Sequence, residues 1–222
     1  MTGLLLALAA TLSAAPSANA PVPVTIDAAA PSSPAAPRHD QADPCASGAI
    51  GNDGMGRRRR CAGLTAYAFQ PEARAAYDDA PDGPSHAKVW VDEVRVRWAL
   101  SLSMSVSSLY PEGSCPYAVT LAHETGHWND YLRLQKEAAA GLRADLEKAG
   151  LPTKAAPARL PARGLAAFEA KTTAKISALF LARRAEFLRR ARAAAAARDS
   201  PYAYQRNDVA KCPSSQWRTA SP

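Results

Sequence analysis

Aromatic side chains are scarce in this chain, at 7% of its 222 residues. Alanine supplies much of the apolar content instead, so we expect a modest core that is largely helical. Long apolar runs are also missing, because beyond residues 1–20 no stretch reaches the ~18 residues of a membrane-spanning helix. This excludes an integral protein with several spans. The remaining balance, 47% hydrophobic and 21% charged residues, is typical of a globular protein and not of a disordered tail or a fibre.

The first residues form a pattern typical of export. An apolar stretch runs from Leu4 to Ala14, Pro16 follows it, and residues 18–20 read Ala-Asn-Ala, the small-x-small sequence that signal peptidases cut. The apolar stretch is roughly half the ~20 residues that would span a bilayer, which disfavours a retained anchor. We therefore predict a signal peptide over residues 1–20 and a secreted or periplasmic protein, with no transmembrane segment after cleavage.

The chain has four cysteines, and none of them forms a CxxC pair. In an exported protein an even number of cysteines predicts disulfides, and their spacing does not suit a zinc site. Three pairings are possible, and the sequence does not choose among them. We expect Cys45 to pair with Cys61 and Cys115 with Cys212.

The organisation of the mature chain follows from its composition and periodicity. Residues 21–44 are rich in proline and alanine, so we expect a flexible linker before a single domain over residues 45–222. From Val94 to Val106 apolar residues alternate with arginine, alanine or serine, which predicts a half-buried strand. Residues 64–69 predict a second, shorter strand.

Two long helices are expected after the strands. The period becomes helical after Pro116 and continues to Gly150, which is placed to end the helix. Prolines and a glycine mark residues 151–164 as a connection, and a second helix is predicted from Leu165 to Arg198. The fold class is therefore α+β, with a long strand or small antiparallel sheet packed against two long helices.

The first predicted helix carries the chemistry-bearing motif, His123-Glu124-Thr125-Gly126-His127. Histidines at positions i and i+4 project from one helix face, so their imidazole nitrogens can converge on one metal ion. The intervening glutamate can then take a proton from a water molecule that the metal activates. The competing interpretation is a surface helix with two solvated histidines, which the helical, exported context disfavours.

This HExxH segment on a helix that follows a strand resembles the zincin metallopeptidases. The exported layout is similar to that of bacterial proteins described as predicted secreted zinc-dependent proteases. The resemblance implies a zincin-like domain with His123 and His127 as Zn²⁺ ligands and Glu124 as the general base. It also implies a peptide or protein substrate that lies along a strand edge, for which the stretch before Tyr110 is the candidate.

A catalytic zinc site needs a third protein ligand, and two histidines leave that position open. No histidine follows His127, so the pattern HExxHxxGxxH is excluded. The related arrangement takes a glutamate from a later helix, for which Glu169 and Glu186 are the candidates. Glu169 falls within the apolar stripe of the second helix, where an unpaired carboxylate would be costly, so we expect it to be the ligand.

Three other carboxylates remain open for this role. Glu186 has arginines at positions 183, 189 and 190, so a helical ion pair is its expected role. Asp130 lies one turn after His127 and could orient a ligand histidine instead of binding the metal. Asp208, in the tail, is the third alternative.

The basic character of the chain supports a second hypothesis. Lysine and arginine number 27 against 20 acidic residues, a net charge of +7, and residues 57–60 are four consecutive arginines. Such runs are usually solvated, but they can also bind anionic cell-envelope polymers. The alternative function is therefore a non-enzymatic, envelope-binding protein in which HExxH is structural or incidental. Nucleic acid is not an expected partner, because the chain is exported and carries no known binding module.

Overall fold

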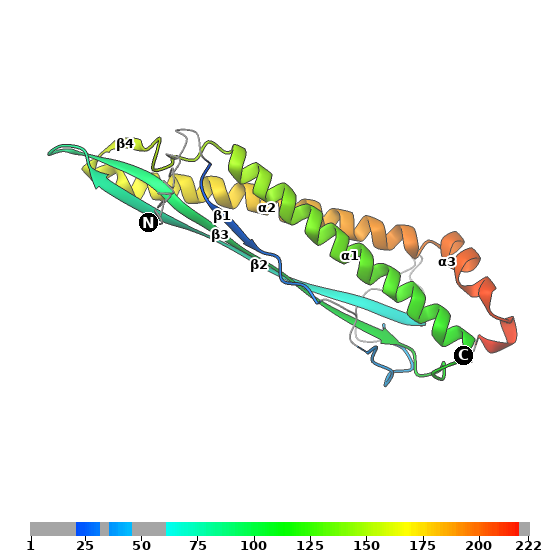
Figure 1. Ribbon diagram of the computed structural model, residues 1–222. Helices are drawn as coiled ribbons and strands as arrows, with labels where there is room; N and C mark the ends of the chain where they lie inside the picture. Colours follow the sequence, from blue (N-terminus) through cyan, green and yellow to red (C-terminus); the bar gives the residue numbers. More distant parts are fainter. Residues whose placement is uncertain (1–20, 32–35, 46–60, 218–222) are drawn as a thin grey trace, which may run out of the picture.

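The computed structural model describes residues 21–31, 36–45 and 61–217. The predicted signal peptide and the run of four arginines lie outside the described residues. The described part is elongated, with a long β-hairpin and two long helices extending along the same axis (Figure 1).

The hairpin consists of β2 (Gly63–Pro81) and β3 (His86–Val106), which pair antiparallel over their whole length. Gly83 lies in the connecting turn at a φ of 89°, a conformation that suits glycine. The strand predicted from the alternating residues is confirmed as part of β3. The predicted second strand is confirmed too, but β2 continues far beyond Phe69, through a stretch of alanine and aspartate with low intrinsic strand propensity.

Two short strands complete a mixed sheet. The strand β1 (Val24–Asp27) runs parallel to β3, and β4 (Ala158–Pro161) pairs with β3 antiparallel. The expected antiparallel sheet is therefore corrected to a mixed one. For residues 22–27 the expected linker is corrected, because Val22 and Val24 are buried in the core and Val24–Asp27 pairs with β3.

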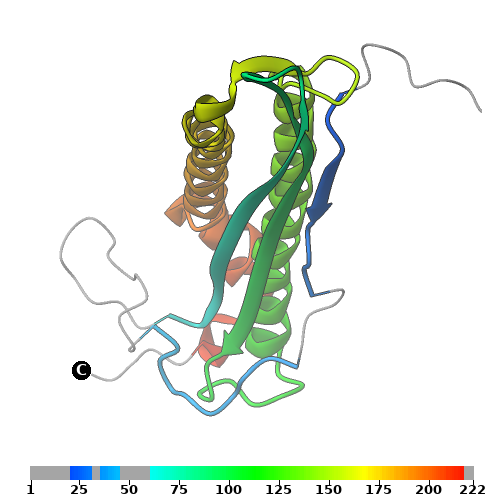
Figure 2. The ribbon, with the colours of Figure 1, turned by 90° about the vertical axis from the view of Figure 1, so that its left-hand side faces the viewer.

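Two helices of equal length cover one face of this sheet (Figure 2): α1 (Cys115–Lys148) and α2 (Leu165–Arg198). Both agree closely with the predicted bounds. The side chain of Ser114 accepts a hydrogen bond from the backbone N–H of Tyr117 and so caps the start of α1. Gly150, at a φ of 62°, follows its end.

The core lies between the inner face of the hairpin and the helix pair. Trp98 of β3 is fully buried, and its ring contacts Phe69 of β2 and Phe180 of α2 edge to face. The side-chain amide of Gln135 on α1 donates a 2.9 Å hydrogen bond to the carbonyl of Trp98, which fixes the helix against the strand. Phe187 extends the aromatic cluster along α2.

Ion pairs connect the two antiparallel helices at three levels. Arginines of α2 bond to acidic residues of α1 in the pairs Arg198–Asp130, Arg190–Glu137 and Arg183–Asp145. The acidic partners later in α1 pair with arginines earlier in α2, as expected for antiparallel helices. The end of α2 is thereby held beside the half of α1 that carries the HExxH segment.

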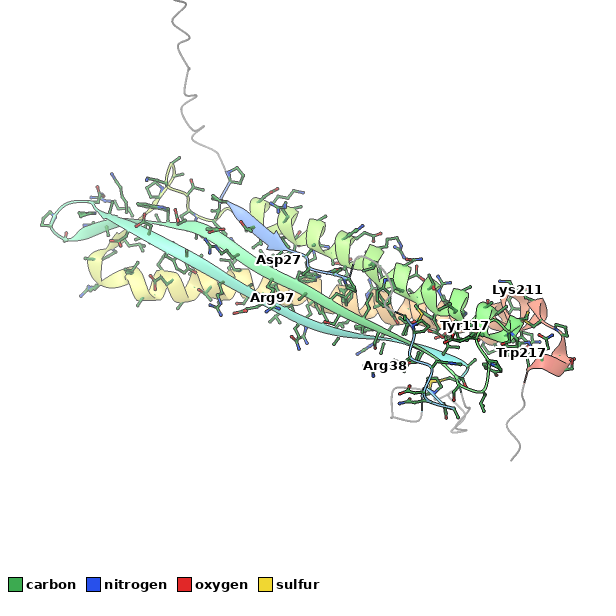
Figure 3. All side chains as sticks on the ribbon, turned by 60° about the horizontal axis from the view of Figure 1, so that its bottom comes forward. Asp27, Arg38, Arg97, Tyr117, Lys211 and Trp217 are labelled. Carbon is green, nitrogen blue, oxygen red and sulfur yellow. A yellow bond between two sulfur atoms is a disulfide. The ribbon has the colours of Figure 1, made fainter. Side chains whose placement is uncertain are left out.

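The tail returns to the start of α1 through α3 (Pro201–Asn207) and the short helical turns η2 (Val209–Lys211) and η3 (Ser214–Gln216). Figure 3 shows Tyr117, Lys211 and Trp217 gathered at this end of the molecule. Disulfides join Cys115 to Cys212 and Cys45 to Cys61, so the expected pairing is confirmed.

Within the described ranges, none of the helices combines the length and the apolar character that crossing a bilayer requires.

Candidate metal centre

Three side chains converge where α2 ends beside α1. The Nε2 atoms of His123 and His127 are 3.1 Å apart, and Oδ1 of Asp199 lies 3.0 Å from the first and 2.8 Å from the second. Both histidines are buried, whereas the aspartate side chain is 57% exposed. The histidines come from successive turns of one helix, and Asp199 directly follows the last residue of the other.

This triangle of ligand atoms fits a metal ion. Bonds of 2.0–2.1 Å in a tetrahedral zinc site place neighbouring ligand atoms about 3.3 Å apart, only slightly more than the three distances here. Two imidazoles and one carboxylate are also a donor set that zinc accepts in catalytic sites. His123, His127 and Asp199 could therefore hold a metal ion.

A fourth side chain fixes the orientation of one histidine. Oδ2 of Asp208 lies 2.8 Å from Nδ1 of His123, and both groups are buried. With Nδ1–H donating to this carboxylate, the lone pair of Nε2 faces the triangle. Metal-binding histidines generally have such a partner, which sets the tautomer and increases the basicity of the ligand nitrogen.

Glu124 lies beside the triangle, on the side that faces β2. Its side chain is buried, and its Oε2 accepts a 2.7 Å hydrogen bond from the hydroxyl of Thr65. A Cβ atom added to Gly63 would lie 2.7 Å from Oε1 of Glu124, so the glycine leaves the space that the carboxylate occupies. The start of β2 thus fits closely around the glutamate.

The buried and partly buried groups of the site shift one another's pKa values. Burial raises the pKa of Glu124 above its ordinary value, against the opposing effects of Thr65 and the two histidines. Burial disfavours the charged form of His123, but the bonds to Asp199 and Asp208 raise its pKa overall. Loss of hydration opposes ionisation of Asp199, yet its bonds to the histidines hold its pKa well below the usual range. Asp199 is therefore in the form that binds cations.

A cavity of about 570 Å³ opens beside His123, between α1 and the segment where α2 leads into α3. Much of its wall consists of alanine methyl groups from both long helices and from α3. The ion pairs Arg198–Asp130 and Lys211–Asp208 also contribute to its lining. The cavity is thus lined in large part by small side chains, and its two acidic residues are matched by two basic ones.

The structure brings together His123, Glu124 and His127 but not the expected third ligand. Glu169 lies near the start of α2, about 45 Å along the helix from Asp199 at 1.5 Å per residue. Its backbone carbonyl accepts a hydrogen bond from the hydroxyl of Tyr77. The expectation for Glu169 is therefore corrected, and Asp199 takes its place in the cluster.

The alternative carboxylates have other partners. Glu186 bonds to Arg183 on its own helix, as expected for a helical ion pair. Asp130 bonds to Arg198 and Arg133, so the orienting role considered for it belongs to Asp208 instead.

Asp199 was missed because a carboxylate just past a helix end looks like an ordinary terminus. One signal could have found it. Two helices of equal length with a short connection are antiparallel neighbours, so the end of the second must return to the start of the first. That places residues near 199, and not Glu169, beside the HExxH segment.

A second group of potential ligands, Asp43 with Cys45 and Cys61, lies near the start of β2. Its cysteines form a disulfide and so offer no thiolate. Oδ1 of Asp43 instead accepts hydrogen bonds from the backbone N–H groups of both cysteines.

No protein-family model matches this chain, and no curated protein or solved structure is significantly similar to it.

Proposed function

We propose that the protein is a secreted zinc-dependent peptidase. The observation that carries the proposal is the convergence of two buried imidazole nitrogens and the Asp199 carboxylate next to a buried glutamate. A purely structural zinc site would be closed by a fourth protein ligand, and a general base would have no use there. Here the cluster provides three possible ligands, and the buried residue next to them is a glutamate, Glu124, which can act as a general base.

The residues divide the chemistry among them. A zinc ion held by His123, His127 and Asp199 would supply a Lewis acid that polarises the substrate carbonyl and makes water more acidic. Glu124 accepts the proton of the attacking water and delivers it to the leaving amine. Burial raises the pKa of Glu124 above its ordinary value, which favours uptake of the proton. Thr65 holds the carboxylate in place during the transfer.

The arrangement of the sheet supports β2, and not β3, as the wall for a peptide substrate. The strand β3 has neighbours on both edges, since β2 lies on one side and β1, β4 and the Arg38 segment lie on the other. The other edge of β2 pairs with no strand among the described residues. An extended peptide could therefore add to β2 near Gly63, where the strand contacts Glu124.

Three proteins test this proposal in one assay: the mature chain, Glu124→Gln and Asp199→Asn. Zinc content is measured by elemental mass spectrometry, and hydrolysis is followed with a diverse mixture of peptides and unfolded proteins. We expect one zinc per chain and chelator-sensitive cleavage for the wild type. Glu124→Gln should keep the zinc and lose cleavage, while Asp199→Asn should lose both. Undiminished cleavage by Glu124→Gln would contradict the peptidase proposal.

The rival function, binding of an anionic envelope polymer, rests on the net charge of +7. It predicts binding that weakens with salt, persists after chelation and is unaffected by Glu124→Gln. The same protein samples can be applied to a polyanion column with and without chelator to distinguish the two functions.

A further inference from the structure

The third ligand of the centre is held in an unusual way. Asp199 is mostly exposed, so packing around its side chain does little to fix it. Its position depends instead on where α2 ends, because its backbone N–H caps that helix by bonding to the carbonyl of Ala195. Whatever anchors the last turn of α2 to α1 therefore decides whether the carboxylate reaches the two histidine nitrogens.

The anchor is the preceding residue, Arg198. Its Nη2 lies 2.6 Å from Oδ2 of Asp130, and its Nε lies 3.3 Å from the same atom. Arg133, which is also in α1, bonds to the other oxygen of Asp130 and so helps to orient the carboxylate toward Arg198. The ion pair spans α1 and α2 directly beside the candidate centre.

The guanidinium lies where Gly126 has no side chain. A Cβ atom added to Gly126 would lie 2.6 Å from Cζ of Arg198 and would also collide with its Nη1. Glycine in a helix interior costs stability relative to alanine, so its presence within the HExxH segment calls for a reason. The close approach of Arg198 is that reason, and it ties the motif itself to the placement of Asp199.

The same arrangement recurs at a distance from the histidines. Arg183 of α2 bonds to Asp145, and a Cβ atom on Gly141 would lie 3.0 Å from its Cζ. Glycine and aspartate are again four residues apart on α1. This second arrangement joins the same two helices but adjoins no member of the candidate centre, and it provides an internal control.

We propose that Arg198, seated on Gly126 and bonded to Asp130, is a positioning residue that holds Asp199 against the histidine pair and thereby sets the metal affinity. This proposal rests on the metal centre proposed above. Arg198 itself is not one of the three residues whose ligand atoms form the triangle. Arg198 acts on the position of the Asp199 carboxylate through the peptide bond between the two consecutive residues.

Zinc affinity tests the proposal, measured by competition with a chromogenic chelator on the disulfide-intact mature chain. Gly126→Ala should weaken zinc binding about 10- to 100-fold, the usual loss when a supporting group of a metal site is disturbed. Gly141→Ala makes the same chemical change in the matched arrangement and should leave affinity within about twofold of wild type. Arg198→Lys should also weaken binding, since an ammonium cannot reproduce the flat, multiply bonded guanidinium.

Two further measurements separate positioning from general damage to the fold. Thermal unfolding of the metal-free proteins should show that both Gly126→Ala and Gly141→Ala fold, and visible spectra of the Co²⁺ forms should differ from wild type only for Gly126→Ala. In the Arg198→Ala background, Gly126→Ala should cause no additional loss of affinity, because the group it displaces is already gone.

Wild-type affinity in Gly126→Ala, or an equal loss in Gly141→Ala, would overturn the positioning role. Neither result would affect the proposed function, provided that the wild type binds zinc and Asp199→Asn does not. Absence of zinc from the wild type would remove the proposed function instead.

Discussion

Asp208 in the tail and His123 in α1 meet through a 2.8 Å bond between Oδ2 and Nδ1, both buried, although they are far apart in the sequence. The bond sets the tautomer in which Nε2 of His123 can bind a cation. It also brings the tail to the candidate centre, since Asp208 lies four positions before Cys212, which is joined to Cys115 at the start of α1.

Removal of the Asp208 carboxylate should therefore weaken metal binding without removing a ligand. We expect Asp208→Ala to lower zinc affinity about 10- to 100-fold, the range typical of groups that orient a ligand histidine. Asp208→Asn keeps an acceptor oxygen and should lose less. Chelator competition measures both, and Asp199→Asn, which deletes a ligand, should be worse than either. Equal affinities for wild type and Asp208→Ala would contradict the orienting role.

The disulfide between Cys115 and Cys212 should stabilise both the chain and the centre. It closes a sequence separation of 97 residues, and constraint of the unfolded chain predicts a contribution of about 4.7 kcal/mol for a loop of roughly that length. We expect Cys115→Ala/Cys212→Ala to lower the free energy of unfolding and the zinc affinity together. Urea unfolding and chelator competition measure the two effects.

The bond between Cys45 and Cys61 is the control for this prediction. Its separation is 16 residues, for which the same reasoning gives about 3 kcal/mol. Its removal should reduce stability but not zinc affinity, because it joins no segment that carries a ligand. A loss of affinity as large as that of Cys115→Ala/Cys212→Ala would show that zinc binding follows overall stability and not the position of the tail.

Gly63→Ala should reduce catalysis while zinc remains bound. Its Cβ atom would lie 2.7 Å from both Oε1 of Glu124 and Cγ2 of Thr120, so the base must move while the ligands keep their positions. We expect a kcat at least about tenfold lower, within the contribution typical of a positioned general base. Gly164→Ala, whose Cβ atom would find its nearest neighbours at 3.7 Å, should be neutral in both assays.

The ion pair between Asp145 and Arg183 should make stability depend on pH on the acid side. The hydrogen bonds from Arg183 hold the pKa of Asp145 below its ordinary value, so the folded protein binds fewer protons than the unfolded chain in that range. The contribution is present above the ordinary pKa of the carboxyl group and is lost as pH falls through the folded value. Asp145→Asn should therefore be less stable than wild type at pH 7.

The difference between Asp145→Asn and wild type should narrow as the pH falls below about 4, where Asp145 of the unfolded chain takes up its proton. Urea unfolding from pH 2 to pH 7 measures this. A difference that stays constant with pH would show that the variant acts through packing and not through charge.

Local patterns were sufficient to predict the two long helices and part of each long strand, but not the short strands β1 and β4. The helix from Leu165 to Arg198 agrees with α2, because apolar spacing and the surrounding prolines are local signals. The continuation of β2 past Phe69 was not predictable in this way. Residues such as Ala73 and Ala75 have weak strand propensity, and their conformation depends on pairing with β3 in a long ladder whose register shifts once, between Ala76 and Tyr77.

The amino-acid sequence by itself determined the two histidines and the glutamate between them, since all three lie within five consecutive residues. It also determined the helix that carries them, because its periodicity and end signals are local. Only the tertiary structure decided the rest of the centre. Asp199 and Asp208 reach His123 because two long helices run antiparallel and a disulfide returns the tail to the start of α1. Ligands of one metal ion must lie close together in space. For residues in different elements, that distance is set by packing and not by spacing along the chain.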